Sequence, residues 1–82
     1  MKKSKADYIF AKVIQQFKVL RTAQGISHEG LARKSGVTRP AISYIESGKR
    51  KPSLLVALRI AYALDQNLSD IVRHAENCKK VK

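Results

Sequence analysis

Residues 27–45 have the sequence SHEGLARKSGVTRPAISYI, a pattern that predicts two short helices joined by a tight turn. Ala32 is small enough to let the second helix approach the first, and Gly36 can adopt the left-handed backbone conformation that ends a helix. Ile42 and Ile45 give the second helix an apolar edge, because residues three apart share one face. These features are typical of a helix-turn-helix motif.

Three more helices are predicted around this motif, so the expected fold class is all-α, a compact five-helix domain. A 3.6-residue apolar rhythm predicts a first helix over about residues 7–24, ended by Gly25. Ser53 is expected to cap an apolar fourth helix, and Ser69 a fifth helix that frays after His74. No segment carries a strand pattern.

Gly30 is unusual for its predicted place inside a helix. It stands where Glu or Gln would complete a capping box with Ser27, and a helical glycine costs about 1 kcal/mol relative to alanine. Close approach of the backbone to a phosphate or to a neighbouring helix, and tolerance at a surface position, are both open as explanations.

The composition indicates one small domain with an anionic partner. The chain has 82 residues, and its 17 Lys and Arg against 6 Asp and Glu give a formal net charge of +11. This excess favours nucleic acid or an anionic membrane surface, of which we favour nucleic acid. No apolar run approaches the roughly 18 residues that span a bilayer, and the basic start lacks the apolar core of a signal peptide, so a cytoplasmic protein is expected.

Metal and cofactor sites are not expected. The single Cys78 cannot form an internal disulfide, and no Cys/His cluster has metal-ligand spacing. Catalysis is not expected either, because the chain has no Gly-rich phosphate loop, no paired carboxylates at useful spacing and no nucleophile constellation.

A set of spaced positions follows a single pattern along most of the chain. They are Leu20-Arg21, Ile26-Ser27, Leu31-Ala32, Ser35-Gly36-Val37, Ile42-Ser43, Ile45-Glu46-Ser47-Gly48-Lys49-Arg50, Pro52-Ser53-Leu54, Ile60-Ala61 and Ala63-Leu64. In this pattern the chain resembles the Cro and lambda-repressor-like helix-turn-helix family, also called XRE, of bacterial and phage transcription regulators. Restriction-modification controller proteins in particular have a similar length and helical plan, as do phage repressor domains and antitoxins.

The resemblance implies a sequence-specific reader of double-stranded DNA, with helix 39–47 in the major groove. Its base-contacting residues would be Arg39, Pro40, Ser43 and Tyr44. Arg39 can bond bidentately to O6 and N7 of guanine, and such a pair discriminates between bases by about 1–3 kcal/mol. Contact of Arg39 with phosphate alone, and packing of Tyr44 beside Ile45, are the alternatives.

Basic and polar side chains around the motif are expected to contact DNA phosphates, although a solvated basic face is the simpler reading. They are His28, Arg33, Lys34, Thr38, Ser47, Lys49, Arg50 and Lys51. Many members of the family carry at the position of His28 a glutamine that contacts a phosphate. Histidine can also donate to phosphate, and protonation strengthens that bond, so mildly pH-sensitive binding is a hypothesis. An exposed histidine without a role is the alternative.

Glu46 is the one acidic residue between Arg33 and Lys51. The resemblance implies that it forms a structural ion pair with Arg21 of the first helix and so ties helix 39–47 to the rest of the domain. Loss of one partner is then expected to destabilise the fold more than it alters specificity.

A homodimer is expected, because one short helix reads only a few base pairs. Two copies on a near-palindromic operator, with half-sites about 10 base pairs apart, supply the missing specificity. The expected interface consists of apolar residues on the last two helices: Leu55, Val56, Tyr62, Ile71 and Val72. The rival function is an antitoxin or regulatory adaptor that acts mainly through a protein partner.

Three regions are predicted along the chain. Residues 1–6 would be a flexible basic arm, residues 7–76 the DNA-binding domain with its motif at about 27–47, and residues 77–82 a basic tail. The arm either reaches DNA or is a solubilising extension. Double-stranded DNA and a second copy of the chain are therefore the expected partners, without a membrane or a small-molecule ligand.

Overall fold

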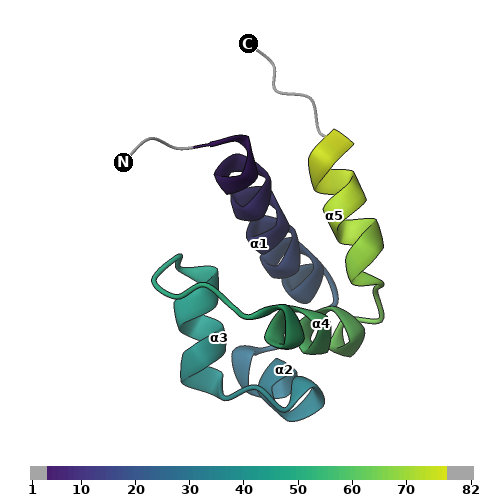
Figure 1. The fold of residues 1–82 in the computed structure, drawn as a ribbon. Coiled ribbons are helices and arrows are strands. Elements are labelled where there is room, and N and C mark those ends of the chain that lie inside the picture. The colour runs from purple at the N-terminus through teal and green to yellow at the C-terminus, as the bar shows by residue number, and fades with distance from the viewer. Residues whose placement is uncertain (1–3, 78–82) are drawn as a thin grey trace.

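The computed structural model describes residues 4–77, and every regular element in this range is an α-helix. The five helices are α1 (Lys5–Ala23), α2 (His28–Ser35), α3 (Arg39–Glu46), α4 (Leu54–Ala63) and α5 (Leu68–Asn77). The predicted all-α, five-helix fold is thus confirmed (Figure 1).

The helices enclose one apolar core. Helix α1 packs against α5 and α3, and α2 packs against α3 and α4. In Figure 1, α1 and α5 run side by side, and α2 and α3 form the opposite end of the molecule. The buried core residues are Val13, Ile14, Phe17, Leu31, Val37, Ile42, Ile45, Ile60, Ala61, Leu64, Ile71 and Ala75. Because the core holds one side of α3, the other side of this helix is left for solvent.

The turn between α2 and α3 has the predicted geometry. Gly36 ends α2 with φ of 76°, a left-handed conformation in which glycine lacks the steric penalty of other residues. The backbone N–H of Val37 donates to the buried Ser35 hydroxyl at 3.1 Å, so this polar group is satisfied in the core. Thr38 caps α3 by accepting a hydrogen bond from the Ala41 N–H at 3.3 Å.

Helix α1 begins earlier than predicted. The Ser4 hydroxyl accepts from the Asp7 N–H, and the Ser4 N–H donates to the Asp7 carboxylate at 2.9 Å, which completes a capping box. Lys5 and Ala6 therefore belong to the helix, and the boundary of the basic arm at residue 6 is wrong. Residues 1–3 lie outside the described range.

Helix α5 also differs from the prediction. It begins at Leu68, so Ser69 is inside the helix and is not its cap. The Asn67 carbonyl instead accepts the first helical hydrogen bond, from the Ile71 N–H at 3.2 Å. The helix extends past His74 to Asn77, which the sequence places in the tail, and residues 78–82 are outside the described range.

The atoms nearest to a Cβ at Gly30 belong to the segment directly before α2 and not to another helix. A Cβ atom at this position would lie 3.2 Å from Cγ2 of Ile26, which itself rests against the core. The Gly30 N–H also donates to the capping hydroxyl of Ser27 at 3.0 Å. A larger residue at this position would therefore crowd the Ile26 side chain, which precedes α2.

Candidate nucleic-acid interface

Helix α3 has one buried and one exposed side. Ile42 and Ile45 are only 1% and 2% exposed, whereas Arg39, Pro40 and Tyr44 are exposed to solvent. Ser43, the fourth residue expected to contact bases, is half-buried, so it offers less of its surface to a ligand. Three of the four proposed base-contacting residues thus share the accessible side of this helix.

The basic loop after α3 is tied to the last turn of the helix. The carbonyl oxygen of Tyr44 accepts from the N–H groups of Lys49 and Arg50 at 2.9 and 3.2 Å, and from the Ser47 hydroxyl at 3.1 Å. Gly48 makes this tight return possible with φ of 84°. The guanidinium of Arg50 lies 5.9 Å from the centre of the Tyr44 ring, a contact that the sequence analysis did not predict. The loop therefore carries its charges at a defined position beside the exposed side of α3.

The expected phosphate-contacting residues come from α2, from the two ends of α3 and from the loop after α3. Lys49, Arg50 and Lys51 are exposed on the loop, and Thr38 and Ser47 are exposed at the two ends of α3. On α2, the Arg33 guanidinium already pairs with the Glu29 carboxylate at 3.5 Å, and Lys34 borders a hollow against α4.

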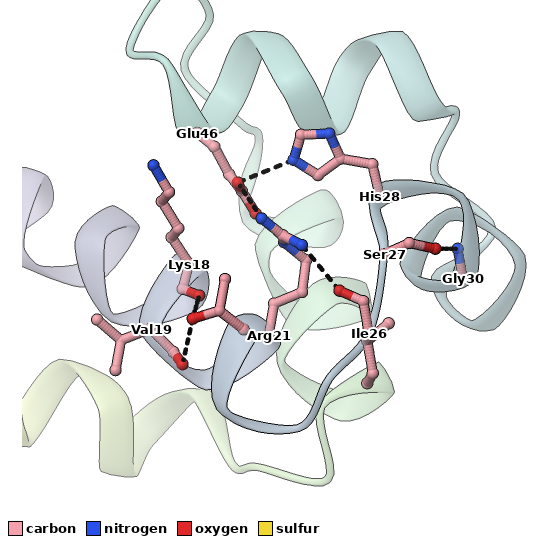
Figure 2. A network of polar contacts seen from close by, with 9 residues as sticks. Lys18, Val19, Arg21, Ile26, Ser27, His28, Gly30 and Glu46 are labelled. Atoms are coloured by element: carbon pink, nitrogen blue, oxygen red, sulfur yellow. Dashed lines mark hydrogen bonds and ion pairs between the residues drawn. The ribbon is translucent and has the colours of Figure 1, made fainter.

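Arg21 and Glu46 form a bidentate ion pair between α1 and α3. Arg21 Nε lies 2.7 Å from Glu46 Oε2, and Nη2 lies 3.0 Å from Oε1. Arg21 Nη1 donates to the Ile26 carbonyl at 2.7 Å, so one guanidinium joins α1, α3 and the segment before α2 (Figure 2). Both side chains are largely buried, with 12% and 7% of their surface exposed. The family resemblance implied a pair between these two residues, and its role in holding α3 stays a prediction.

His28 also reaches Glu46. Its Nε2 atom lies 3.0 Å from Glu46 Oε1, so the imidazole joins the first residue of α2 to the last residue of α3. Burial raises the pKa of Glu46, but the hydrogen bonds from Arg21 and His28 and their positive charges outweigh it, and the net pKa is lowered. Glu46 is therefore an ionised acceptor near neutral pH. From the sequence, His28 was expected either to contact phosphate or to have no role, and its contact with Glu46 was not predicted.

The apolar face expected to form a dimer interface needs revision. Ile71 is only 3% exposed and belongs to the core, so its assignment to the interface is wrong. Val56 and Val72 are half-buried against the core. Leu55 and Tyr62 are 58% and 61% exposed.

Leu54 on α4 was missed, although it is the most exposed of the large apolar residues at 71%. Its place in the first turn of the helix, just after the cap Ser53, was the available signal. Of the five exposed large apolar side chains among the described residues, three therefore lie on α4, and the others are Val19 on α1 and Tyr44 on α3.

Other kinds of site find little support in the described residues. No group of three or more His, Cys, Asp or Glu within residues 4–77 is placed to hold a metal ion. None of the helices in this range combines the length and the apolar character needed to cross a membrane.

The architecture, with the exposed side of α3 next to a basic loop, defines a helix-turn-helix protein. The chain belongs to the helix-turn-helix family, whose model matches residues 17–71, and the XRE-type resemblance is confirmed. The restriction-modification controller protein C.AhdI from Aeromonas hydrophila has a similar structure, with a TM-score of 0.70 and 39% identity over 76% of this chain and 94% of that one.

Proteins with similar sequences are described as regulators of transcription. The uncharacterized HTH-type transcriptional regulator YgzD of Bacillus subtilis is 43% identical over 66% of this chain and 82% of its own length. The uncharacterized HTH-type transcriptional regulator MJ0272 of Methanocaldococcus jannaschii is 39% identical over 68% of this chain and 85% of its own. The family is thus one of DNA-binding transcription regulators.

Proposed function

We propose that this protein is a sequence-specific regulator of transcription that acts in the cytoplasm and binds a near-palindromic operator as a homodimer. Helix α3 enters the major groove, and no catalytic step is involved. The observation that carries the proposal is the two-sided character of α3, since its apolar side is buried in the core while Arg39, Pro40 and Tyr44 are accessible. A helix held in this way can present side chains to base edges without losing its own packing.

The surroundings of α3 support binding to a polyanion. Lys49, Arg50 and Lys51 are exposed on a loop whose backbone is bonded to the end of α3, which places three positive charges next to the exposed helix side. The one carboxylate on α3, that of Glu46, is turned inward and neutralised by Arg21. The surface presented to DNA therefore keeps its positive charge.

The exposed apolar residues of α4 support the homodimer. Leu54, Leu55 and Tyr62 are large apolar side chains that remain exposed on one helix. Exposed apolar patches of this kind mark protein–protein interfaces. We propose that these residues, with the half-buried Val56 and Val72 at the margin, meet the same residues of a second copy across a two-fold axis. Such a dimer would present two α3 helices to successive turns of DNA.

The proposal is tested by selecting from a random duplex library at about 150 mM salt and sequencing the retained DNA. A two-fold symmetric motif supports dimeric reading of the major groove. Equal, salt-sensitive retention of every sequence would reject specific binding and leave a partner-dependent adaptor as the better interpretation.

Two variants separate base contacts from phosphate contacts. Arg39→Ala should relax the preference at one base pair of each half-site by about 1–3 kcal/mol. Lys49→Ala should weaken binding to all sequences alike and lower the salt dependence. If Arg39→Ala changed only the salt dependence, Arg39 would be a phosphate contact.

A further inference from the structure

We propose that a hollow between α1 and the loop after α3 binds a small amphipathic carboxylate, and that this ligand opposes the binding of DNA. The opposition to DNA rests on the proposed function, whereas the binding of the ligand does not. The hollow, which we call the α1 hollow, has a volume of about 470 Å³. Sites for small molecules usually have volumes of about 300–1,000 Å³.

The floor of the α1 hollow is apolar. Phe10 and Ile14 contribute to it from α1, and Ile45 contributes from α3. Ile14 and Ile45 belong to the core and are only 9% and 2% exposed, and Phe10 is half-buried against the same core. Because packing holds these side chains on their inner side, the floor can cover a hydrocarbon group without rearrangement.

The rim of the α1 hollow carries positive charge. Lys18 on α1, together with Arg50 and Lys51 on the loop, borders the hollow and is exposed. In Figure 2 the Lys18 side chain extends from α1 toward the side on which Glu46 lies. Within residues 4–77 none of these three cations forms an ion pair. They can therefore receive the carboxylate of a ligand.

The two carboxylates that border the α1 hollow do not remove this preference. Glu46 accepts from Arg21 at 2.7 and 3.0 Å, so its charge is compensated inside the protein. Asp7 accepts from the N–H and the hydroxyl of Ser4 at 2.9 Å each, at the N-terminus of α1, where the helix dipole favours a negative charge. The rim therefore favours an anion over a cation or a neutral ligand.

An apolar floor and a cationic rim together fit one ligand chemistry. A carboxylate accepts charge-assisted hydrogen bonds from Arg50 or from the two lysines, while a hydrocarbon body covers Phe10 and Ile14. Inorganic anions lack the apolar part, and neutral hydrocarbons lack the charge. The ligand is therefore a small acid with an aromatic or aliphatic body. No sequence motif marks this site, because its two walls come from segments far apart in the chain.

Occupation of the α1 hollow changes the surface proposed for DNA. Arg50 and Lys51 border the hollow and also belong to the loop proposed to meet phosphates. A carboxylate bound between them neutralises charge that otherwise attracts the DNA backbone, so ligand and DNA oppose each other. Each must weaken the binding of the other by the same factor, which is typically about 5–150-fold for coupled sites. We expect at least about fivefold here.

The first experiment measures ligand binding in the absence of DNA. The probes are phenylbutyrate and octanoate, titrated into isotope-labelled protein at constant pH and ionic strength. Backbone NMR shifts should change around the α1 hollow, at Ala11, Gln15 and Gly48. The neutral phenylbutyramide should bind about fivefold more weakly, because an exposed ion pair contributes up to this factor. Equal affinity for the amide, shifts confined to α4 at Leu55 and Tyr62, or no shifts with either probe would overturn the proposal.

Three variants locate the site. Lys18→Gln removes a rim cation that is not proposed to contact DNA, so it should weaken both probes by up to about fivefold and leave the affinity for operator unchanged. Lys12→Gln is the matched control, because Lys12 lies on the same helix, 5.6 Å from the centre of the Tyr8 ring, and does not border the hollow. Ala11→Trp fills the hollow from an exposed position and should abolish probe binding. Equal losses for Lys18→Gln and Lys12→Gln would reject the site.

The last experiment measures the effect of the ligand on DNA binding. Saturating phenylbutyrate should weaken binding of the selected operator by about fivefold or more relative to the same concentration of acetate. The Ala11→Trp variant should show no such difference. Probe binding in the α1 hollow with unchanged affinity for operator would overturn the opposition to DNA. A protein that binds the probes there but retains no specific DNA would defeat the proposed function and support the ligand site.

Discussion

Replacement of Glu46 by alanine tests whether the ion pair holds α3 in place. The variant removes both acceptors of the Arg21 guanidinium, at 2.7 and 3.0 Å, and leaves it with the Ile26 carbonyl as its remaining partner among these contacts. Removing one partner of a buried pair costs about 3–5 kcal/mol, because the other charge is left without compensation. We expect about 3 kcal/mol here, since Arg21 keeps one hydrogen bond and is 12% exposed.

This loss is large for a small domain. The total stability of a protein is typically about 5–15 kcal/mol, and a domain of this size loses roughly 4–8 °C in Tm per kcal/mol. Circular dichroism should therefore show a Tm for Glu46→Ala lower by about 12–24 °C. Urea unfolding at pH 7 gives the free energy independently.

Glu29→Ala is the matched control, because Glu29 pairs with Arg33 at 3.5 Å while both side chains are at least 70% exposed. Its effect should stay within about 1 kcal/mol. The double variant Arg21→Met/Glu46→Leu should recover most of the loss, since no buried charge is left unpaired. A Tm for Glu46→Ala equal to that of the wild type or of Glu29→Ala would refute the reasoning.

Three further predictions concern the pKa of Glu46, the turn at Gly36 and the exposed side of α4. The pKa of Glu46 is lowered in the folded protein, so the ionised carboxylate contributes its full stabilisation above the unfolded pKa of 4.5. This stabilisation is lost as the pH falls through the folded pKa. Acid titrations followed by circular dichroism should therefore show a smaller loss of stability for Glu46→Gln than for the wild type. Gly36→Ala should cost about 1–2 kcal/mol in urea unfolding because φ is 76°, and an unchanged midpoint would contradict the strain. Tyr62→Glu should convert the proposed dimer to a monomer in analytical ultracentrifugation without lowering the Tm of the monomer, because Tyr62 is exposed. A variant that dimerises with unchanged affinity would exclude this part of α4 from the interface.

The candidate site was only partly predictable from the sequence. The pairing of Arg21 with Glu46 followed from the family resemblance, because 25 residues of sequence separate the partners and no local pattern joins them. His28 and Glu46 are 18 residues apart, and no local pattern predicts their contact either. Both contacts exist because α1, α2 and α3 meet at one point, which depends on the packing of the whole core.

The apolar residues of α4 and α5 show a similar limit. Ile71 is apolar, and the helical period places it on the apolar face of its helix. The period does not say whether that face packs against the core or against a second subunit. In the structure α1 packs along α5 and buries Ile71, while Leu54 and Leu55 remain in solvent.

The sequence alone was sufficient for the starts of α2, α3 and α4 and for the turn between α2 and α3. Ser27, Thr38 and Ser53 each accept an N–H three residues ahead, and Gly36 adopts a conformation that most residues avoid, so these features depend on local sterics and hydrogen bonds. Only the tertiary structure decided which apolar faces are buried and which charges meet, because those outcomes depend on how distant helices pack together. His28 shows both effects, because local sequence places it at the start of α2, whereas the packing of α2 against α3 brings it to Glu46.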